Sequence, residues 1–192
     1  MKKLLFVDCC VSQRGEHSRT LALARAYLDA FREKHPDWAV ERAELAGLAP
    51  FTPEMLDQRD GLAKRGDFGA EVFAPARAFQ AADAIVVAAP LWDMSYPALL
   101  KIYIEHISAN GLCYHYDAAG CHGDCRAERL VYLTSGGDFE TGESVGVLHW
   151  KQLCTMFGIE KFDYVFAGGL DIDPNKTGEL LEAACRRARE LV

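Results

Sequence analysis

The chain has 192 residues, of which 50% are hydrophobic and 26% are charged, and its formal net charge is −7 at pH 7. This length suffices for one domain with a full core, and the acidic balance argues against nucleic acid as a partner, because phosphate binding needs a basic face. No apolar run approaches the roughly 18 residues of a membrane span, so we expect no membrane partner.

Apolar runs and amphipathic stretches alternate from the start of the chain. Residues 4–7 form a short continuous apolar run, which is typical of a strand buried on both faces. Asp8 interrupts this run, and no small-residue cleavage site follows, so a strand is favoured over a signal peptide. Apolar residues recur at helical spacing over 21–31, and residues 38–45 predict a second strand.

The middle of the chain holds a long irregular stretch and the most apolar strand. Residues 46–70 are rich in Pro, Gly and Asp and predict a long excursion. A helix near 71–82 and a strand over 84–89 follow. Pro97 then opens a further helix, which Asn110-Gly111 ends.

The last third of the chain continues the alternation. After a short extended piece over 112–116, the pattern predicts strands over 130–133 and 162–167 with a helix near 144–157 between them. Asp173-Pro174 is expected to cap a last helix. Five alternations imply parallel strands joined by crossovers, so we predict an α/β fold in a single domain over 1–192. The expected sheet is open and doubly wound, with five parallel strands in the order 2-1-3-4-5.

The seven cysteines are not spaced like a disulfide framework, so we expect a reducing cytoplasm. Cys9 and Cys10 are expected to be buried, inert thiols. The segment Cys121-His122-Gly123-Asp124-Cys125 contains zinc-ligand residue types, but the spacing is not C-x₂-C and no second ligand pair lies nearby. A loop with incidental cysteines is therefore favoured, and no metal is predicted.

In an open α/β sheet, ligands bind beyond the carboxyl ends of the strands, and three unusual loops leave the sheet there. The loop over 8–20 places Ser18 and Thr20 at a helix start, which suits a phosphate, although a plain capped helix is an open alternative. The loop over 90–97 offers backbone amides beside Trp92 for a planar aromatic ligand, unless the indole only packs. The loop over 134–139 contains paired glycines, which fit either close backbone approach to a ligand or an ordinary turn.

Taken in order, several segments resemble the FMN-dependent NADH-azoreductases, relatives of the NAD(P)H:quinone oxidoreductases with a flavodoxin-like fold. These segments are HSRT (17–20), APLWDMSYPALLKIYIE (89–105), GLCYHY (111–116), TSGG (134–137) and VFAGG (165–169). The resemblance implies a flavoprotein that takes hydride from NADH or NADPH and passes it through FMN to a small-molecule electron acceptor, a quinone or an azo compound. Two alternatives stay open, namely a flavodoxin-type electron carrier and a flavin-free regulatory module on the same fold.

The resemblance also implies positions for the cofactor. The phosphate would face Cys10, Glu16, His17 and Ser18. The ring would lie along the backbone amides of Leu91, Trp92, Asp93 and Met94, with Ser135, Gly136, Gly137 and Asp138 on its other side. The chain departs from the family in three places: Cys9-Cys10 stand where serine is usual, Asp93 replaces an asparagine, and Gly136 replaces a side chain that is often arginine. No side chain is predicted to be catalytic.

A substrate pocket and a subunit interface complete the expectations. Tyr114 and Tyr116 could wall a substrate pocket, with aromatic packing as the alternative. The resemblance implies a homodimer whose active sites lie at the subunit boundary. The excursion over 46–70 carries apolar residues that an interface would bury, and the helix after Pro97 would contribute Tyr103 and Ile107. The alternative is that 46–70 forms an ordered surface loop on a monomer.

Overall fold

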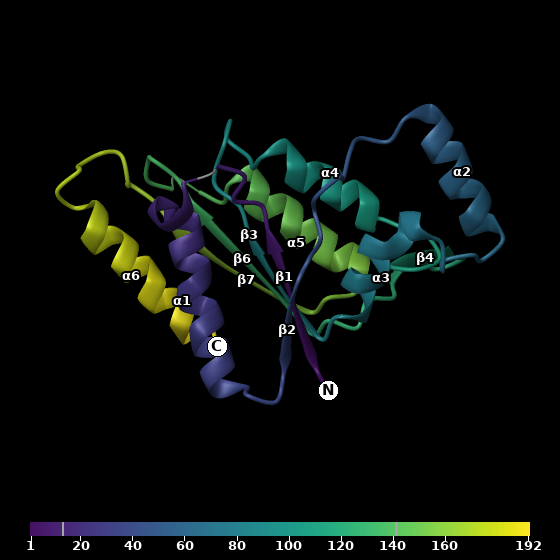
Figure 1. Ribbon diagram of the computed structural model, residues 1–192, viewed down its shortest axis with the longest axis horizontal. Helices are drawn as coiled ribbons and strands as arrows, with labels where there is room; N and C mark the ends of the chain where they lie inside the picture. Colours follow the sequence, from purple (N-terminus) through teal and green to yellow (C-terminus); the bar gives the residue numbers. More distant parts are fainter. Residues whose placement is uncertain (13, 141) are drawn as a thin grey trace.

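Five parallel strands form the centre of the computed structural model, which describes residues 1–12, 14–140 and 142–192 (Figure 1). The strands are β1 (Lys3–Asp8), β2 (Ala39–Arg42), β3 (Ala84–Ala88), β6 (Arg129–Ser135) and β7 (Lys161–Ala167). Their order across the sheet is β2-β1-β3-β6-β7, and every neighbouring pair is parallel. The predicted order 2-1-3-4-5 is therefore confirmed.

Helices cover both faces of the sheet. Side chains alternate along each strand, so neighbouring residues face different helix layers. Leu4 and Phe6 of β1 face α1 (Arg19–Lys34) and α6 (Thr177–Glu190), whereas Leu5 and Val7 face the opposite layer. That layer consists of α3 (Ala74–Ala81), α4 (Ala98–Ile107) and α5 (Val145–Phe157), and Trp150 of α5 is fully buried in it. The continuous apolar runs in the sequence thus reflect strands that are covered on two sides.

The excursion over 46–70 contains a helix, α2 (Pro53–Lys64), which the sequence pattern did not indicate. Thr52 caps it by accepting a hydrogen bond from the Met55 amide at 3.3 Å, and Pro53 occupies its first turn. None of its residues is fully buried, and its few apolar side chains give only a weak helical stripe, so the pattern does not predict a helix.

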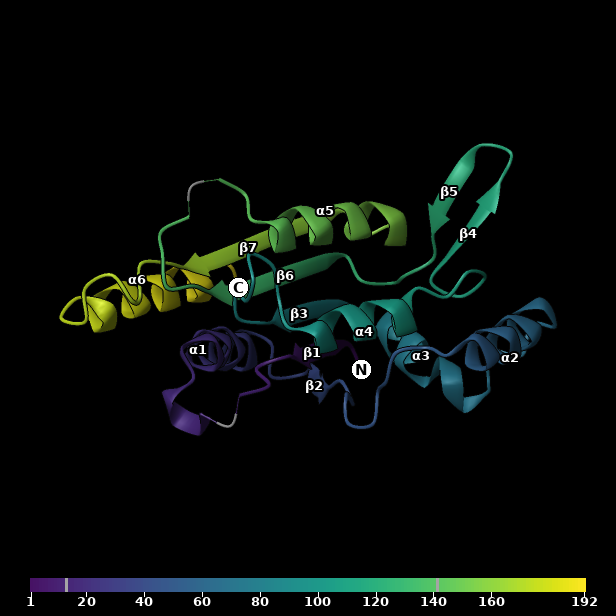
Figure 2. The ribbon, with the colours of Figure 1, turned by 90° about the horizontal axis from the view of Figure 1, so that it is seen from above.

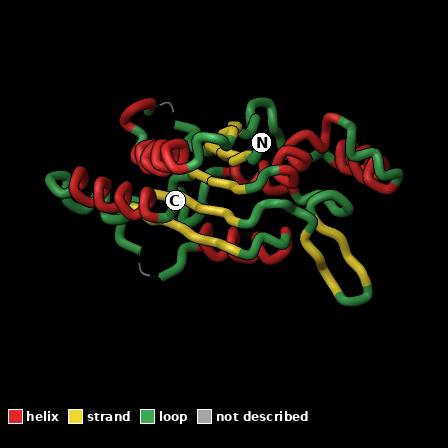
Figure 3. The backbone as a smooth tube through the Cα atoms, turned by 90° about the horizontal axis from the view of Figure 1, so that it is seen from below, coloured by secondary structure: helices red, strands yellow, loops and turns green. Residues whose placement is uncertain are grey.

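A two-stranded antiparallel hairpin stands away from the main sheet (Figures 2 and 3). It consists of β4 (Tyr114–Asp117) and β5 (Gly120–Gly123), so the extended piece expected over 112–116 has a partner that was not foreseen. Gly123 anchors its base, because a Cβ there would collide with the backbone between Phe157 and Gly158 at the end of α5. The strands are too short and too polar to give a periodic signal.

Several element boundaries differ from expectation. β2 is shorter than 38–45, and the segment near 71–82 begins as a 3₁₀ turn, η2 (Glu71–Phe73), before α3. Asp173-Pro174 lies in a turn ahead of α6 instead of capping it, with the Asp173 carboxylate accepting from the Asn175 amide at 3.0 Å. None of the described helices combines the length and the apolar character that a membrane crossing requires.

Candidate functional site

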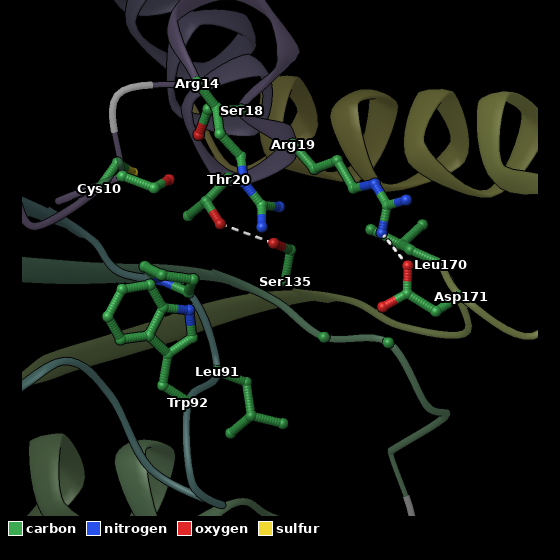
Figure 4. Close-up of a pocket in the computed structure, with 14 residues that line it drawn as sticks. Cys10, Arg14, Ser18, Arg19, Thr20, Leu91, Trp92, Ser135, Leu170 and Asp171 are labelled. Atoms are coloured by element: carbon green, nitrogen blue, oxygen red, sulfur yellow. Dashed lines mark hydrogen bonds and ion pairs between the residues drawn. The ribbon is translucent and has the colours of Figure 1, made fainter.

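A cavity of about 220 Å³ opens at the carboxyl ends of the strands, where the predicted loops meet (Figure 4). Its walls come from the segments after β1 and β3, from the end of β6, and from a fourth segment after β7 that was not foreseen. The residues that line it are Cys10, Ser12, Arg14, Ser18, Arg19, Thr20, Pro90, Leu91, Trp92, Ser135, Gly136, Gly137, Leu170 and Asp171.

One end of the cavity has the helix start and the cationic side chains that suit an anion. It lies at the N-terminus of α1, where Ser18 is the N-cap and its Oγ accepts a hydrogen bond from the Leu21 amide at 3.3 Å. A helix N-terminus carries partial positive charge and free amide groups, which favour a phosphate or carboxylate. Arg14 and Arg19 add two guanidinium groups to the same wall, so both the field and the hydrogen-bond donors suit a phosphate.

A buried hydrogen bond fixes the helix against the sheet beside this end. The hydroxyl oxygens of Thr20 and Ser135 lie 2.6 Å apart, and both residues are buried. The bond connects the first turn of α1 to the end of β6, so the anion-binding end keeps a fixed position relative to the glycine loop that follows.

The opposite wall combines a glycine loop with the segment after β3. The Leu91 amide donates to the Ser135 carbonyl at 2.8 Å, and the Gly136 amide donates to the Ala167 carbonyl at 3.0 Å. A Cβ at Gly136 would lie 2.8 Å from the Phe166 ring and 3.1 Å from Leu91, so a larger residue does not fit without movement. The bare backbone at this wall permits close approach by a flat ligand.

Asp93 and Met94 form a strained turn at the edge of the cavity. Both have positive φ, of 50° and 63° respectively, as in a type I′ turn, and Trp92 and Ser95 pair across it. The Trp92 amide donates to the Ser95 carbonyl at 3.3 Å, and the Ser95 amide donates back at 2.8 Å. Left-handed backbone at residues other than glycine is costly and is concentrated at functional sites. The turn keeps Trp92 43% exposed beside the cavity (Figure 4).

This pairing narrows the set of amides that could face a ligand. Of the four backbone amides over 91–94, those of Leu91 and Trp92 already donate within the protein. Those of Asp93 and Met94 have no acceptor among the described residues. If a ring lies along this segment, these two amides are the ones left to bind it.

Replacing Met94 with glycine is expected to raise the free energy of unfolding by about 1 kcal/mol, because glycine adopts the left-handed backbone without strain. The Met94 side chain is 76% exposed, so its removal loses little packing. The midpoint of urea unfolding measures the change. Ser95→Gly, next to it but without a positive φ, should instead destabilise the protein. An equal loss in both variants would show that the Met94 backbone stores no strain.

The structure brings half of the predicted site residues together in this cavity: Cys10, Ser18, Leu91, Trp92, Ser135, Gly136 and Gly137. Asp93 and Met94 lie at its edge in the strained turn, and the Asp138 carbonyl accepts the Gly169 amide just beyond it. His17 is exposed at the end of η1 (Gly15–His17), and the side chain of Glu16 is outside the described residues.

Tyr114 and Tyr116 do not line this cavity. They belong to the hairpin, at the end of the molecule opposite the start of α6 (Figure 2). Their predicted role as substrate walls therefore stays a prediction, and it needs a second copy of the chain to bring them near a site of this kind.

Sequence reasoning named Thr20 only as part of the loop over 8–20, and it did not assign these further lining residues: Ser12, Arg14, Arg19, Pro90, Leu170 and Asp171. A signal existed for most of them. Arg14, Arg19 and Thr20 lie in the very loop that predicted a phosphate, and the carboxyl ends of all parallel strands share one edge of the sheet. The loop after β7, with Asp171, had to open onto the same edge.

The thiols beside the cavity are not nucleophiles. Burial, together with the nearby Asp8 carboxylate, raises the pKa of Cys10 to about 12, although a hydrogen bond with Ser18 partly opposes this. Burial likewise raises the pKa of Cys9. Both groups stay protonated near neutral pH and lack thiolate reactivity.

The first three residues of the cysteine–histidine segment, Cys121 to Gly123, belong to the hairpin strand β5, and Asp124 and Cys125 follow it. His122 hydrogen-bonds to the Asp117 carboxylate at 2.8 Å and stacks on His115 across the strands, with ring centroids 5.3 Å apart. His115 in turn bonds to Asp124 at 2.8 Å. Within the described residues, no three or more His, Cys, Asp or Glu side chains gather in a geometry that could hold a metal ion.

The chain is similar to known proteins over nearly its whole length. The family model described as "Flavodoxin-like fold" matches residues 2–192. FMN-dependent NADH:quinone oxidoreductase 5 of Pseudomonas fluorescens is 31% identical over 88% of this chain and 87% of its own length. The FMN-dependent NADH:quinone oxidoreductase of Clostridium beijerinckii is 27% identical over 99% of this chain and 98% of its own.

Solved structures agree on the fold. An azoreductase from Bacillus anthracis superposes with a TM-score of 0.87 at 22% identity, covering 100% of this chain and 98% of its own. An FMN-dependent NADH-azoreductase from the same species, solved in complex with FMN, gives a TM-score of 0.82 at 19% identity and covers 100% and 97%. The resemblance drawn from the sequence is confirmed: the chain belongs to the flavodoxin-like fold family and, within it, to the FMN-dependent NADH:quinone oxidoreductases.

Proposed function

We propose that this protein takes hydride from NADH and delivers it, through bound FMN, to a quinone or an azo compound. The observation that carries this function is the cavity itself, with a helix start that suits an anion at one end and, opposite it, a wall that combines a bare glycine loop with Trp92. It lies between the loops that follow β1 and β3, where the strand order reverses, which is the expected ligand position in this topology.

The residues present fit FMN. The N-terminus of α1 with Ser18, Arg14 and Arg19 suits a phosphate, and Gly136 and Gly137 present bare backbone to the cavity, with no side chain of their own in the way of a flat ring. The cavity of about 220 Å³ is smaller than the roughly 300 Å³ or more of typical cofactor pockets, so part of the ring would project past its mouth. A single phosphate cradle favours FMN over FAD.

Flavin, when bound, supplies the transfer of an electron pair, which no protein side chain can carry out alone. This chain's residues bind and orient. Arg14, Arg19 and the α1 amides would hold the phosphate, and the amides of Asp93 and Met94 would face the ring edge. Trp92 would exclude water from one side of the site. Hydride transfer leaves an anion on the quinone or azo acceptor, and the proton that completes the reduction would come from solvent at the open mouth of the site. No catalytic side chain is therefore assigned.

The absorbance spectrum of the purified protein, followed by NADH oxidation with and without a benzoquinone, tests this function. A flavin spectrum, with FMN identified by mass after denaturation, and quinone-dependent NADH oxidation are expected. Bound FMN without quinone-dependent oxidation would favour an electron carrier. A colourless protein that stays so after FMN is added would favour a flavin-free module.

We further propose that the chain works as a homodimer with shared sites. Three observations support it. Helix α2 has 12 residues and buries none of them fully, and a helix of that length is marginal without a partner surface. Tyr116 is 64% exposed at the hairpin. The loops at the cavity mouth expose further apolar side chains, among them Trp92, Met94, Phe139 and Ile172.

The apolar residues of 46–70 support the interface less than expected. Phe51 stacks on His106 with ring centroids 4.2 Å apart, and Leu62 packs against the core, so a single chain already covers much of both. Among the large apolar side chains of 46–70, Leu56 is the one that remains exposed to solvent, at 40%. Tyr103 and Ile107 of α4 are fully buried within the chain and are not free for an interface.

Sedimentation of the FMN-loaded protein at micromolar concentration is expected to give one species at twice the monomer mass, because the exposed mouth and α2 need a second surface. A dilution series should then show dissociation together with loss of quinone reductase activity. A single species at the monomer mass with full activity would contradict the shared site.

The reducing cytoplasm is the compartment we propose. All seven cysteines are free, and buried thiols such as Cys154 and Cys185 lie where no partner thiol pairs with them. Free cysteines in this number favour a reducing environment. Fractionation of the source cells, with the flavoprotein recovered outside the cytosolic fraction, would contradict this placement.

A further inference from the structure

An ion pair crosses the anion-binding end of the cavity. Arg19 Nη1 lies 2.5 Å from Asp171 Oδ1, and both side chains line the cavity (Figure 4). Arg19 is the first residue of α1, whereas Asp171 follows β7, so the pair bridges two walls. The Arg19 and Asp171 side chains are 36% and 66% exposed, so solvent and ligands can reach both.

The backbone holds the Asp171 carboxylate at this place. Its amide donates to the Gly137 carbonyl at 3.0 Å, and the Leu170 amide donates to the Gly136 carbonyl at 3.4 Å. The carboxylate lies directly over Gly137, where a Cβ would collide with it. Gly169, with φ of 74°, turns the chain into this position. These backbone bonds therefore fix Asp171 at this wall, within reach of the Arg19 guanidinium.

This carboxylate opposes the rest of the wall. The α1 N-terminus, Arg14 and Arg19 all attract an anion, and Asp171 is the one acidic side chain among the described residues lining the cavity. A phosphate dianion entering here meets repulsion from Asp171 and finds one of two guanidinium groups already paired.

We propose that Asp171 is an internal competitor for Arg19, so that the FMN phosphate binds by displacing the Asp171 carboxylate from the guanidinium. This role rests on the proposed FMN function. It makes FMN affinity lower, and FMN release faster, than the cationic wall alone would give. Riboflavin has no phosphate, so its affinity would not depend on whether Asp171 pairs with Arg19.

Apoprotein titrated with FMN and, separately, with riboflavin, with flavin fluorescence as the readout, tests the competition. Asp171→Asn is expected to tighten FMN binding about fivefold to twentyfold and to slow FMN release in stopped-flow displacement, while riboflavin affinity changes less than about twofold. In an Arg19→Gln background, the gain from Asp171→Asn should shrink to about twofold or less, because the contested group is gone.

Asp173→Asn is the matched control, since it removes one carboxylate two residues further on that does not line the cavity. It should leave both affinities within about twofold of the parent. Circular dichroism of each apoprotein confirms that the variants are folded.

Weaker FMN binding by Asp171→Asn would overturn the competitor role, because it would mean that the ion pair supports FMN binding. An equal gain for riboflavin, or the full gain in the Arg19→Gln background, would also overturn it. A parent protein and an Asp171→Asn variant that both fail to bind either flavin would refute the FMN function itself. A parent that binds FMN with an affinity unchanged in Asp171→Asn refutes only the competition.

Discussion

Replacing Arg14 with Gln is expected to weaken FMN binding about tenfold to thirtyfold while leaving riboflavin binding within about twofold, because a charge-assisted hydrogen bond to phosphate contributes about 1.5–2 kcal/mol at a partly exposed site. Arg14 lines the cavity and, unlike Arg19, forms no ion pair with a carboxylate in the described part of the chain. Its full charge is thus available to the phosphate. Fluorescence titration with the two flavins measures the difference.

Arg25→Gln provides the control, because Arg25 is exposed on α1 and does not line the cavity, so its replacement removes the same charge away from the site. If Arg14 acts only through the net charge of the protein, both variants lose FMN affinity equally. Loss of riboflavin affinity in Arg14→Gln would mean that the side chain supports the loop and not the phosphate.

The sheet and the location of the site could be predicted because both follow from strong, local signals. Strands such as β3 are covered on two faces and read as unbroken apolar runs, and parallel strands with crossovers leave few topologies. Once the order reverses between β1 and β3, ligand position follows. The sequence pattern alone therefore predicts which loops form the site.

The elements that escaped prediction are stabilised by contacts that leave no periodic pattern. Helix α2 has a cap and a proline but only a weak apolar stripe, and the hairpin depends on the fit of Gly123 against the end of α5. Asp171 could not be assigned because an ion pair between residues 152 positions apart is a property of the folded chain. Positive φ at Met94 was equally hidden, since methionine carries no signal for a left-handed backbone.

The strained turn explains why aspartate can stand at position 93 in place of the family's asparagine. Aspartate and asparagine both tolerate the left-handed region better than most residues, so the turn keeps its shape with either one. What changes is charge, because aspartate adds a carboxylate where the family has a neutral amide. If FMN lies along this turn, we expect the backbone to hold the ring and the Asp93 side chain to adjust the reduction potential.

Replacing Asp93 with Asn is expected to keep FMN bound and to raise its two-electron reduction potential by about 20–40 mV. A carboxylate beside the ring disfavours the anionic reduced flavin, and at an exposed position this repulsion amounts to about 1–2 kcal/mol. Removing it makes reduction easier, so the potential moves upward. Equilibration with a reference dye, followed by absorbance, measures the potential.

Asp37→Asn is the matched control, because Asp37 is an exposed carboxylate between α1 and β2, at the amino ends of the strands and so at the opposite end of the sheet from the cavity. The reduction potential of FMN bound to this variant should stay at the parent value, since charges beyond about 10 Å are screened at moderate salt. A shift of equal size in both variants would mean that Asp93 acts only through net charge. Loss of flavin from Asp93→Asn would mean that the carboxylate itself is a ligand, and that the two free amides of the turn are insufficient to hold the ring.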